Sequence, residues 1–290
     1  MLDETAAGVF TIAVTPFLPD GALDLNSIDT MVDAYVERGA TGLESMTVVK
    51  RVVARTDLPI IVGVSSPGFA AMDALSKGSM DAGAAGVMVA PPGSLKTDAQ
   101  IVNYYHNTAE TLGDAPFVLQ DFPLVTNVVI SPSVILKIVE DLPTCVMLKH
   151  EDWPGLDKIS TLRRASDEGA RRISILCGNG GMFLLEEMLR GADGAMTGFG
   201  YPEMMAQVVA AYYAGDEPRA RDIFDAYMPM VRYESQPGQG LAIRKHTLTK
   251  TGVIAHPTVR NHGGGLSADS IKEVDTLADR QTVKLRELGL

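Results

Sequence analysis

The feature that most constrains the fold is an alternation of short apolar runs with longer helical patterns along the whole chain. The runs lack a strict apolar–polar alternation, which is typical of strands that are covered on both faces. Eight such strand–helix units predict an α/β fold, a (β/α)8 TIM barrel. The runs are Phe10–Phe17, Ala40–Leu43, Pro59–Ser66, Gly86–Pro92, Pro116–Pro123, Cys145–Asp152, Ile173–Gly180 and Gly194–Gly200.

Residues that stabilise helix ends mark several of the helical segments. Asp24, Thr97 and Ser131 stand where capping side chains are expected, and Pro154 stands near the start of another helix. An open, doubly wound sheet is the alternative architecture, but no dinucleotide-binding glycine pattern follows the first run.

The chain after the eighth run is mostly helical and longer than one helix requires. We therefore expect a barrel over residues 1–205, and the eighth helix with a C-terminal helical extension over residues 206–290. A loop at His262–Gly265 is expected within this extension.

The second run, Ala40–Leu43, is about half as long as the others and leads directly into a helical pattern at residues 44–51. A parallel crossover can be made in roughly a dozen residues, but a barrel strand with no loop after it is unusual. Either a functional loop has been lost or a segment is absent from this sequence. We predict a chain break or severe distortion between Leu43 and Glu44.

Composition excludes several classes of protein. The net charge of −11 and the absence of a basic run argue against a nucleic-acid partner. Cys145 and Cys177 lie in apolar runs, as expected for a reduced, cytoplasmic protein without disulfides. No apolar stretch approaches the roughly 20 residues that span a membrane, and the acidic N-terminus does not resemble a signal peptide. The five histidines show no metal-ligand spacing, so no metal is expected.

Lys149 is the main candidate for chemistry, because it ends an apolar stretch in the sixth run. Desolvation disfavours a charged ammonium, and a neutral lysine amine forms imines (Schiff bases) with carbonyl compounds. Barrel enzymes carry their catalytic groups at the C-terminal ends of the strands, and Lys149 is the one amine expected there. The structural alternative is a lysine whose ammonium reaches solvent at the strand end.

Motifs along nearly the whole chain resemble those of the dihydrodipicolinate synthase / N-acetylneuraminate lyase superfamily of class I aldolases. The resemblance implies a (β/α)8 barrel, a covalent imine between Lys149 and a keto-acid substrate, no separate cofactor, and a cytoplasmic homodimer or homotetramer. The matching segments are Thr15–Phe17, Asp20–Asp24, Leu119–Pro123, Lys149, Gly178–Gly180 and Arg244-Lys245.

The chain departs from the family pattern at four places. Gln120 replaces the tyrosine that relays protons in the family, and glutamine cannot titrate. Leu124–Thr126 lacks the arginine that binds a carboxylate in the synthases, and the Gly-Thr-Thr-Gly-Glu motif of the second strand is missing. Pro91–Gly93 stands where the family has a tyrosine after the fourth strand. A role in lysine synthesis is therefore not expected.

Asp121 and Glu151 are the carboxylates that could supply the missing acid–base chemistry as catalytic residues. Alternation along the sixth strand places Lys149 and Glu151 on the same side, and turns His150 toward the helices. The structural alternative for Glu151 is an ion pair at the barrel rim.

Six further residues are expected to bind substrate, with turn stabilisation as the structural alternative. They are Thr15, Gln120, Thr126, Gly178, Asn179 and Gly198. The sequence thus predicts a Schiff-base-forming lyase, of the aldolase, hydratase-aldolase or dehydratase type, acting on a 2-oxo acid such as pyruvate or a sugar-derived keto acid. The alternatives are an impaired barrel kept for ligand binding or assembly, and a phosphate-binding barrel enzyme without imine chemistry.

Overall fold

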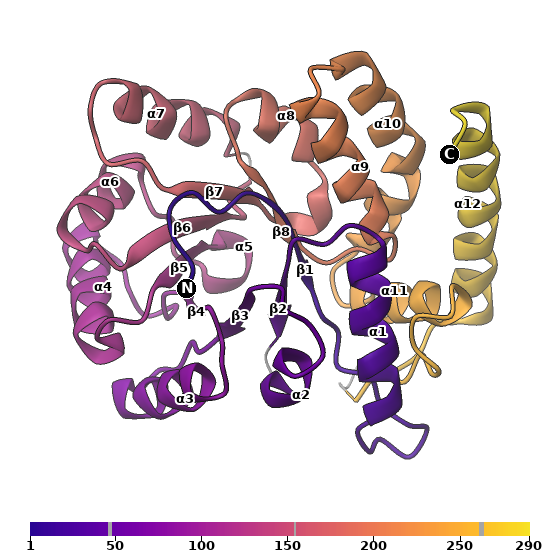
Figure 1. Cartoon of the computed structure of the whole chain (residues 1–290), viewed down its shortest axis with the longest axis horizontal. Coiled ribbons are helices and arrows are strands. Elements are labelled where there is room, and N and C mark those ends of the chain that lie inside the picture. The colour runs from indigo at the N-terminus through magenta and orange to yellow at the C-terminus, as the bar shows by residue number, and fades with distance from the viewer. Residues whose placement is uncertain (46–47, 154, 261–263) are drawn as a thin grey trace.

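The chain forms a closed barrel of eight parallel strands in a computed structural model that describes residues 1–45, 48–153, 155–260 and 264–290 (Figure 1). Each strand pairs with its neighbours in chain order, and β8 pairs with β1 to close the ring. The predicted (β/α)8 barrel is confirmed, and every predicted run overlaps one strand. The strands are β1 Gly8–Ile12, β2 Gly42–Ser45, β3 Ile60–Gly63, β4 Gly86–Val89, β5 Phe117–Asp121, β6 Cys145–His150, β7 Ser174–Cys177 and β8 Gly194–Thr197.

Helices connect the strands and surround the barrel (Figure 1). The expected caps are present: the side chains of Asp24, Thr97 and Ser131 accept hydrogen bonds from backbone N–H groups in the first turns of α1, α4 and α6. The helices are α1 Leu25–Glu37, α2 Val49–Val53, α3 Phe69–Asp81, α4 Asp98–Leu112, α5 Pro123–Thr126, α6 Pro132–Asp141, α7 Leu156–Asp167, the 3-10 helix η1 Asn179–Gly181, α8 Leu184–Leu189 and α9 Pro202–Tyr213.

The sheet separates two apolar layers. One lies between the strands and the helices, and it includes Leu119 and Leu148. The other fills the barrel interior and includes Val118, Met147, Leu176 and Met196. Because side chains alternate between the two faces of a strand, these layers fix which residues near the strand ends point into the barrel.

The second strand is continuous where a break was predicted. Strand β2 runs from Gly42 through Leu43 and Glu44 to Ser45. Glu44 pairs with Ile12 of β1 and with Ile61 of β3, so ladders on both sides hold this part of the strand in register. The prediction of a chain break between Leu43 and Glu44 is therefore wrong, although the described part of the connection to β3 contains only the short helix α2. Residues 46 and 47, in the predicted helical pattern, lie outside the described residues.

In the described part of the chain after α9, three helices form the C-terminal extension: α10 Glu217–Glu234, α11 Gly240–Lys250 and α12 Ala268–Glu287. Helix α10 packs against α9 and α12, and α12 lies at the outer edge of the molecule (Figure 1). The domain boundary expected between residues 205 and 206 falls inside α9. Pro154 and residues 261–263, where a helix start and part of a loop were predicted, lie outside the described residues. No helix among the described ranges is both long and apolar enough to cross a membrane.

Candidate active site

Lys149 lies inside the barrel near the C-terminal end of β6. Met147, two residues earlier, packs in the barrel interior, so alternation directs Lys149 to the same face. Its side chain is only 2% exposed. Lys149 pairs in register with Gln120 of β5 and with Leu176 of β7. The amine is therefore buried among strand ends, the position at which barrel enzymes carry their catalytic groups.

Glu151 supplies a carboxylate beside this amine. Its Oε2 lies 3.8 Å from Lys149 Nζ, and its side chain is 6% exposed. The Gln120 amide nitrogen, Nε2, donates a hydrogen bond of 2.6 Å to the same Oε2. The three side chains therefore form one cluster at the ends of two neighbouring strands, with Lys149 and Glu151 buried and Gln120 half-buried. A buried amine next to a carboxylate can exchange protons with it, which both carbonyl addition and general acid–base steps require.

The turn after β7 holds Glu151 from the other side. The Asn179 side chain donates a hydrogen bond of 2.9 Å to the backbone oxygen of Glu151. A Cβ atom added to Gly178 would stand 2.1 Å from Glu151 Cγ, so only glycine leaves room for the carboxylate at this position. Asn179 and Gly178, predicted as substrate-binding residues, thus lie against Glu151, Asn179 at its backbone oxygen and Gly178 beside its side chain.

Asp121 does not lie beside the amine. It pairs with His150 in register, and both residues are on the outer face of the barrel because Leu119 and Leu148 point outward two residues earlier. Asp121 Oδ2 accepts a hydrogen bond of 2.5 Å from Lys158 Nζ of α7. Burial raises the pKa of the Asp121 carboxyl, and the Lys158 ammonium acts in the opposite direction. The structure therefore does not support the prediction of Asp121 as a catalytic base near Lys149, since the sheet separates the two side chains.

His150 faces the helices, as alternation predicts. Its Nδ1 lies 3.1 Å from Glu187 Oε2 of α8. Burial lowers the pKa of His150, but the Glu187 carboxylate, together with Asp121, more than offsets this, and the net pKa is raised. His150 and Glu187 therefore form a buried pair that ties β6 to α8, outside the barrel interior.

The remaining predicted residues lie around the mouth of the barrel. The backbone oxygen of Thr15 accepts a hydrogen bond of 2.7 Å from Lys245 Nζ. The Thr126 hydroxyl donates to the Phe122 backbone oxygen at 2.9 Å and accepts from the Val128 N–H at 3.2 Å. Thr126 therefore stabilises the turn at α5, which is the structural alternative considered for it.

The arginine near Gly198 was not identified as a candidate from the sequence. A Cβ atom added to Gly198 would stand 2.0 Å from Nη1 of Arg244, which extends from α11. Its Nε donates a hydrogen bond of 2.7 Å to Glu234 Oε1 at the end of α10. The family motif that includes Arg244 marks the segment, but only the packing of the C-terminal helices brings this side chain to the barrel mouth.

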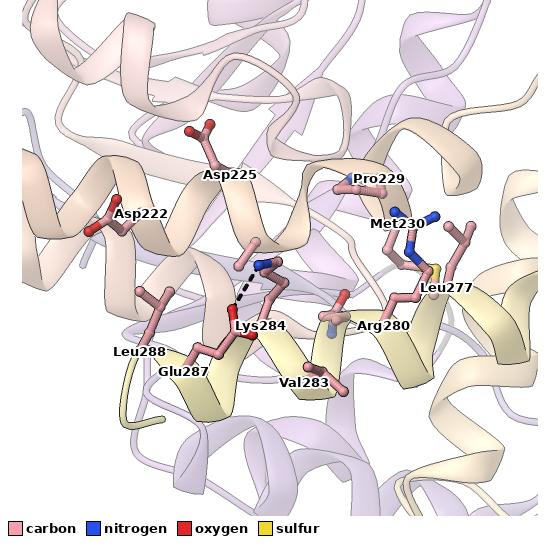
Figure 2. Close-up of a pocket in the computed structure, with 12 residues that line it drawn as sticks. Asp222, Asp225, Pro229, Met230, Leu277, Arg280, Val283, Lys284, Glu287 and Leu288 are labelled. Atoms are coloured by element: carbon pink, nitrogen blue, oxygen red, sulfur yellow. Dashed lines mark hydrogen bonds and ion pairs between the residues drawn. The ribbon is translucent and has the colours of Figure 1, made fainter.

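A hollow lies in the C-terminal extension, between α10 and α12. Its volume is about 680 Å³, and Figure 2 shows charged side chains of both signs around it. Lys284 pairs there with Glu287 at 2.7 Å, and the two side chains are 65% and 58% exposed. This amine is exposed to solvent, so the hollow does not offer a buried amine like that of Lys149. Among the residues that the structure describes, no group of three or more His, Cys, Asp or Glu side chains could hold a metal ion.

Comparison with known proteins agrees with this geometry. The sequence profile of the dihydrodipicolinate synthetase family matches residues 5–281. L-2-keto-3-deoxyarabonate dehydratase of Azospirillum brasilense is 26% identical over 294 aligned positions, covering 94% of each chain. 4-Hydroxy-tetrahydrodipicolinate synthase of Sorangium cellulosum is 30% identical and covers 74% of this chain and 76% of its own. The alignment to the dehydratase is longer than this 290-residue chain, so that relative contains residues without a counterpart here.

A solved structure gives a similar result at higher identity. The crystal structure of dihydrodipicolinate synthase from Rhodopseudomonas palustris superposes with a TM-score of 0.94 and is 49% identical, covering 96% of this chain and 99% of that chain. This protein therefore belongs to the dihydrodipicolinate synthetase family, and it is a lyase of the type found in that family.

Proposed function

We propose that this lyase acts on a 2-oxo acid, such as pyruvate or a sugar-derived keto acid, through an imine formed on Lys149. The observation that carries the proposal is the buried Lys149 amine with the Glu151 carboxylate 3.8 Å away. The neutral amine adds to the C2 carbonyl, and the carbinolamine then loses water to give an iminium. The iminium withdraws electrons from C3 and so makes a C3 proton removable.

Glu151 is proposed as the group that moves this proton. Its carboxylate receives the proton from C3, which leaves an enamine, and it returns a proton later in the cycle. The hydrogen bond from Gln120 holds the carboxylate in place. From this enamine, loss of a hydroxide from C4 gives dehydration. Alternatively, cleavage of the C3–C4 bond of the iminium, with loss of the C4 hydroxyl proton, gives the aldol products.

We further propose that the protein is a cytoplasmic homo-oligomer, a dimer or tetramer that uses the C-terminal helices. Several large apolar side chains of the extension are exposed, including Val283 at 52% and Leu241 at 44%. Cys145 and Cys177 are both free and buried, which suits a reducing compartment. Light scattering on the purified protein measures the mass directly, and a monomer at micromolar concentration would refute the assembly.

Reduction with borohydride in the presence of pyruvate tests the imine. A stable secondary amine is expected on Lys149, located by mass spectrometry of the peptides, and it is absent in Lys149→Met. Lys137→Met is the matched control, because Lys137 is 57% exposed on α6 and its loss leaves labelling at Lys149 unchanged. No adduct with pyruvate or with longer 2-oxo acids would overturn the proposal and favour a barrel without imine chemistry. NMR of the products then separates dehydration from carbon–carbon cleavage.

A further inference from the structure

The Arg244 guanidinium occupies a position inside the barrel mouth that a side chain of β8 would otherwise fill. Gly198 follows β8 and comes two residues after Met196, which packs in the barrel interior. Alternation along the strand therefore places position 198 on the inner face of the barrel. A Cβ atom at Gly198 would stand 2.0 Å from Arg244 Nη1 and 3.3 Å from Ile12 Cβ of β1. The guanidinium therefore lies between the ends of β8 and β1, on the inner side of the sheet.

A buried carboxylate fixes this arginine from behind. Glu234, whose side chain is 3% exposed, accepts from Arg244 Nε at 2.7 Å. Its second oxygen accepts from the Gly200 N–H at 2.9 Å, so Glu234 is itself attached to the loop after β8. Burial raises the pKa of Glu234, and the Arg244 guanidinium counteracts this. The pairing orients the guanidinium and uses only its Nε.

The two terminal nitrogens of Arg244 remain available. Over the described part of the chain, neither Nη1 nor Nη2 donates a hydrogen bond to the protein, and the side chain is 19% exposed. A guanidinium whose two Nη atoms have no partner in the protein matches a carboxylate or phosphate, which accepts two parallel hydrogen bonds. This is the geometry of an anion-binding residue that has been positioned by its partner.

The position of Arg244 relative to Lys149 indicates which end of the substrate Arg244 contacts. One strand, β7, separates β6 from β8, so the two strand axes are roughly 10 Å apart. Lys149 is 2% exposed within its strand, whereas Arg244 lies beyond the end of β8 and is more accessible. A substrate whose carbonyl carbon reaches Lys149 would extend its far end toward the guanidinium.

We propose that Arg244 binds a second anionic group, a carboxylate or a phosphate, at the end of the substrate distant from the carbonyl carbon. This inference rests on the proposed function, since it takes Lys149 as the group that holds the carbonyl end. It makes Arg244 a specificity-determining residue: 2-oxo acids with a second negative charge are preferred over neutral analogues of the same length.

Borohydride trapping with paired substrates tests the preference. Wild-type protein is expected to reach half-maximal trapping with 2-oxoglutarate at a concentration at least about tenfold lower than with 2-oxovalerate, the size of a charge-assisted hydrogen bond. Arg244→Gln removes this preference and changes half-maximal trapping with pyruvate by less than about twofold. Arg164→Gln, an exposed arginine on α7, is the matched control and keeps the preference. The same trapping measurement is made with a phosphorylated 2-oxo-3-deoxy sugar acid and with its unphosphorylated form. A preference for the phosphorylated form would identify phosphate, and not a carboxylate, as the anion that Arg244 binds.

Gly198→Ala provides a second variant that keeps the arginine but displaces its guanidinium, and it should lose the same preference. The inference would be overturned if Arg244→Gln still preferred 2-oxo acids with a second negative charge. It would also be overturned if the wild type preferred neither the second carboxylate nor the phosphate. If Arg244→Gln weakened trapping with pyruvate as much as with 2-oxoglutarate, the inference would also be overturned, because Arg244 would then bind the carboxylate next to the carbonyl.

Calorimetric titration with 2-hydroxyglutarate, which has both carboxylates but no carbonyl, separates this test from the imine. If no imine forms but 2-hydroxyglutarate binds at least about tenfold more tightly to the wild type than to Arg244→Gln, the anion site stands and the proposed function fails.

Discussion

Gln120 and Glu151, at the ends of neighbouring strands, are joined by a hydrogen bond of 2.6 Å from Nε2 to Oε2. By the family resemblance, Gln120 stands at the position of a proton-relaying tyrosine, and the residue it holds is a carboxylate next to the Lys149 amine. In this chain the titratable group beside the amine is the Glu151 carboxylate, and the fifth-strand residue Gln120 is its hydrogen-bond donor.

Glu151→Gln removes the proposed proton carrier and keeps the shape of the side chain. Turnover should fall by about 10²- to 10⁴-fold, the usual contribution of general acid–base catalysis. The reduced adduct on Lys149 should still accumulate when pyruvate and borohydride are incubated for longer. Comparison of trapping yield with steady-state rate checks this, and full activity in Glu151→Gln would remove Glu151 from the mechanism.

Gly178→Ala acts on the same carboxylate from the neighbouring turn. The added methyl would stand 2.1 Å from Glu151 Cγ and must push the carboxylate away from Gln120 and Lys149. We expect the rate of turnover to fall by at least about tenfold, since catalytic groups lose rate when displaced by an ångström. Gly68→Ala is the control, because nothing lies within 4 Å of a Cβ at that position. Equal rates for the two variants would contradict this arrangement.

Lys158→Met tests whether Asp121 is structural. The substitution leaves the Asp121 carboxylate buried without the ammonium 2.5 Å away, and it should lower the free energy of unfolding by about 3–5 kcal/mol. The double variant Asp121→Asn, Lys158→Met should recover part of this loss. Urea denaturation measures both effects. A double variant that is stable but no longer forms the Lys149 adduct would instead assign Asp121 to the chemistry.

The buried amine of Lys245 is expected to make the stability of the protein depend on pH. Burial lowers the pKa of Lys245 from 10.5 to about 8. Between these values the unfolded chain binds the proton and the folded chain does not, so the free energy of unfolding rises with pH, by up to about 3 kcal/mol. Below pH 8 both states are protonated and the slope vanishes.

Lys245→Met lacks this contribution, so the difference in unfolding free energy between wild type and variant should grow from pH 8 to 10.5. Denaturant titrations at several pH values measure it. A difference that stays constant over this range would mean that the folded protein keeps Lys245 charged, held by the Thr15 and Thr258 backbone oxygens at 2.7 Å.

Much of the barrel could be read from the sequence because its signals are local. Apolar runs, helical spacing and capping residues act over a few positions, and all eight strands fall on predicted runs. The one failure, the break predicted at Leu43–Glu44, arose because a short strand looked incomplete by itself. Pairing with β1 and β3 on both sides makes it a regular strand.

The sequence by itself determined the fold class and the burial of Lys149 at a strand end, since both follow from periodicity. Alternation along the sixth strand also placed Glu151 on the side of Lys149, but only the tertiary structure showed that Asp121 does not join them. Glu151 lies on the inner side of the barrel with Lys149, whereas Asp121 lies on the outer side and pairs with Lys158. Arg244 reaches the barrel mouth through the packing of α10 and α11, a contact between distant segments that no local pattern records.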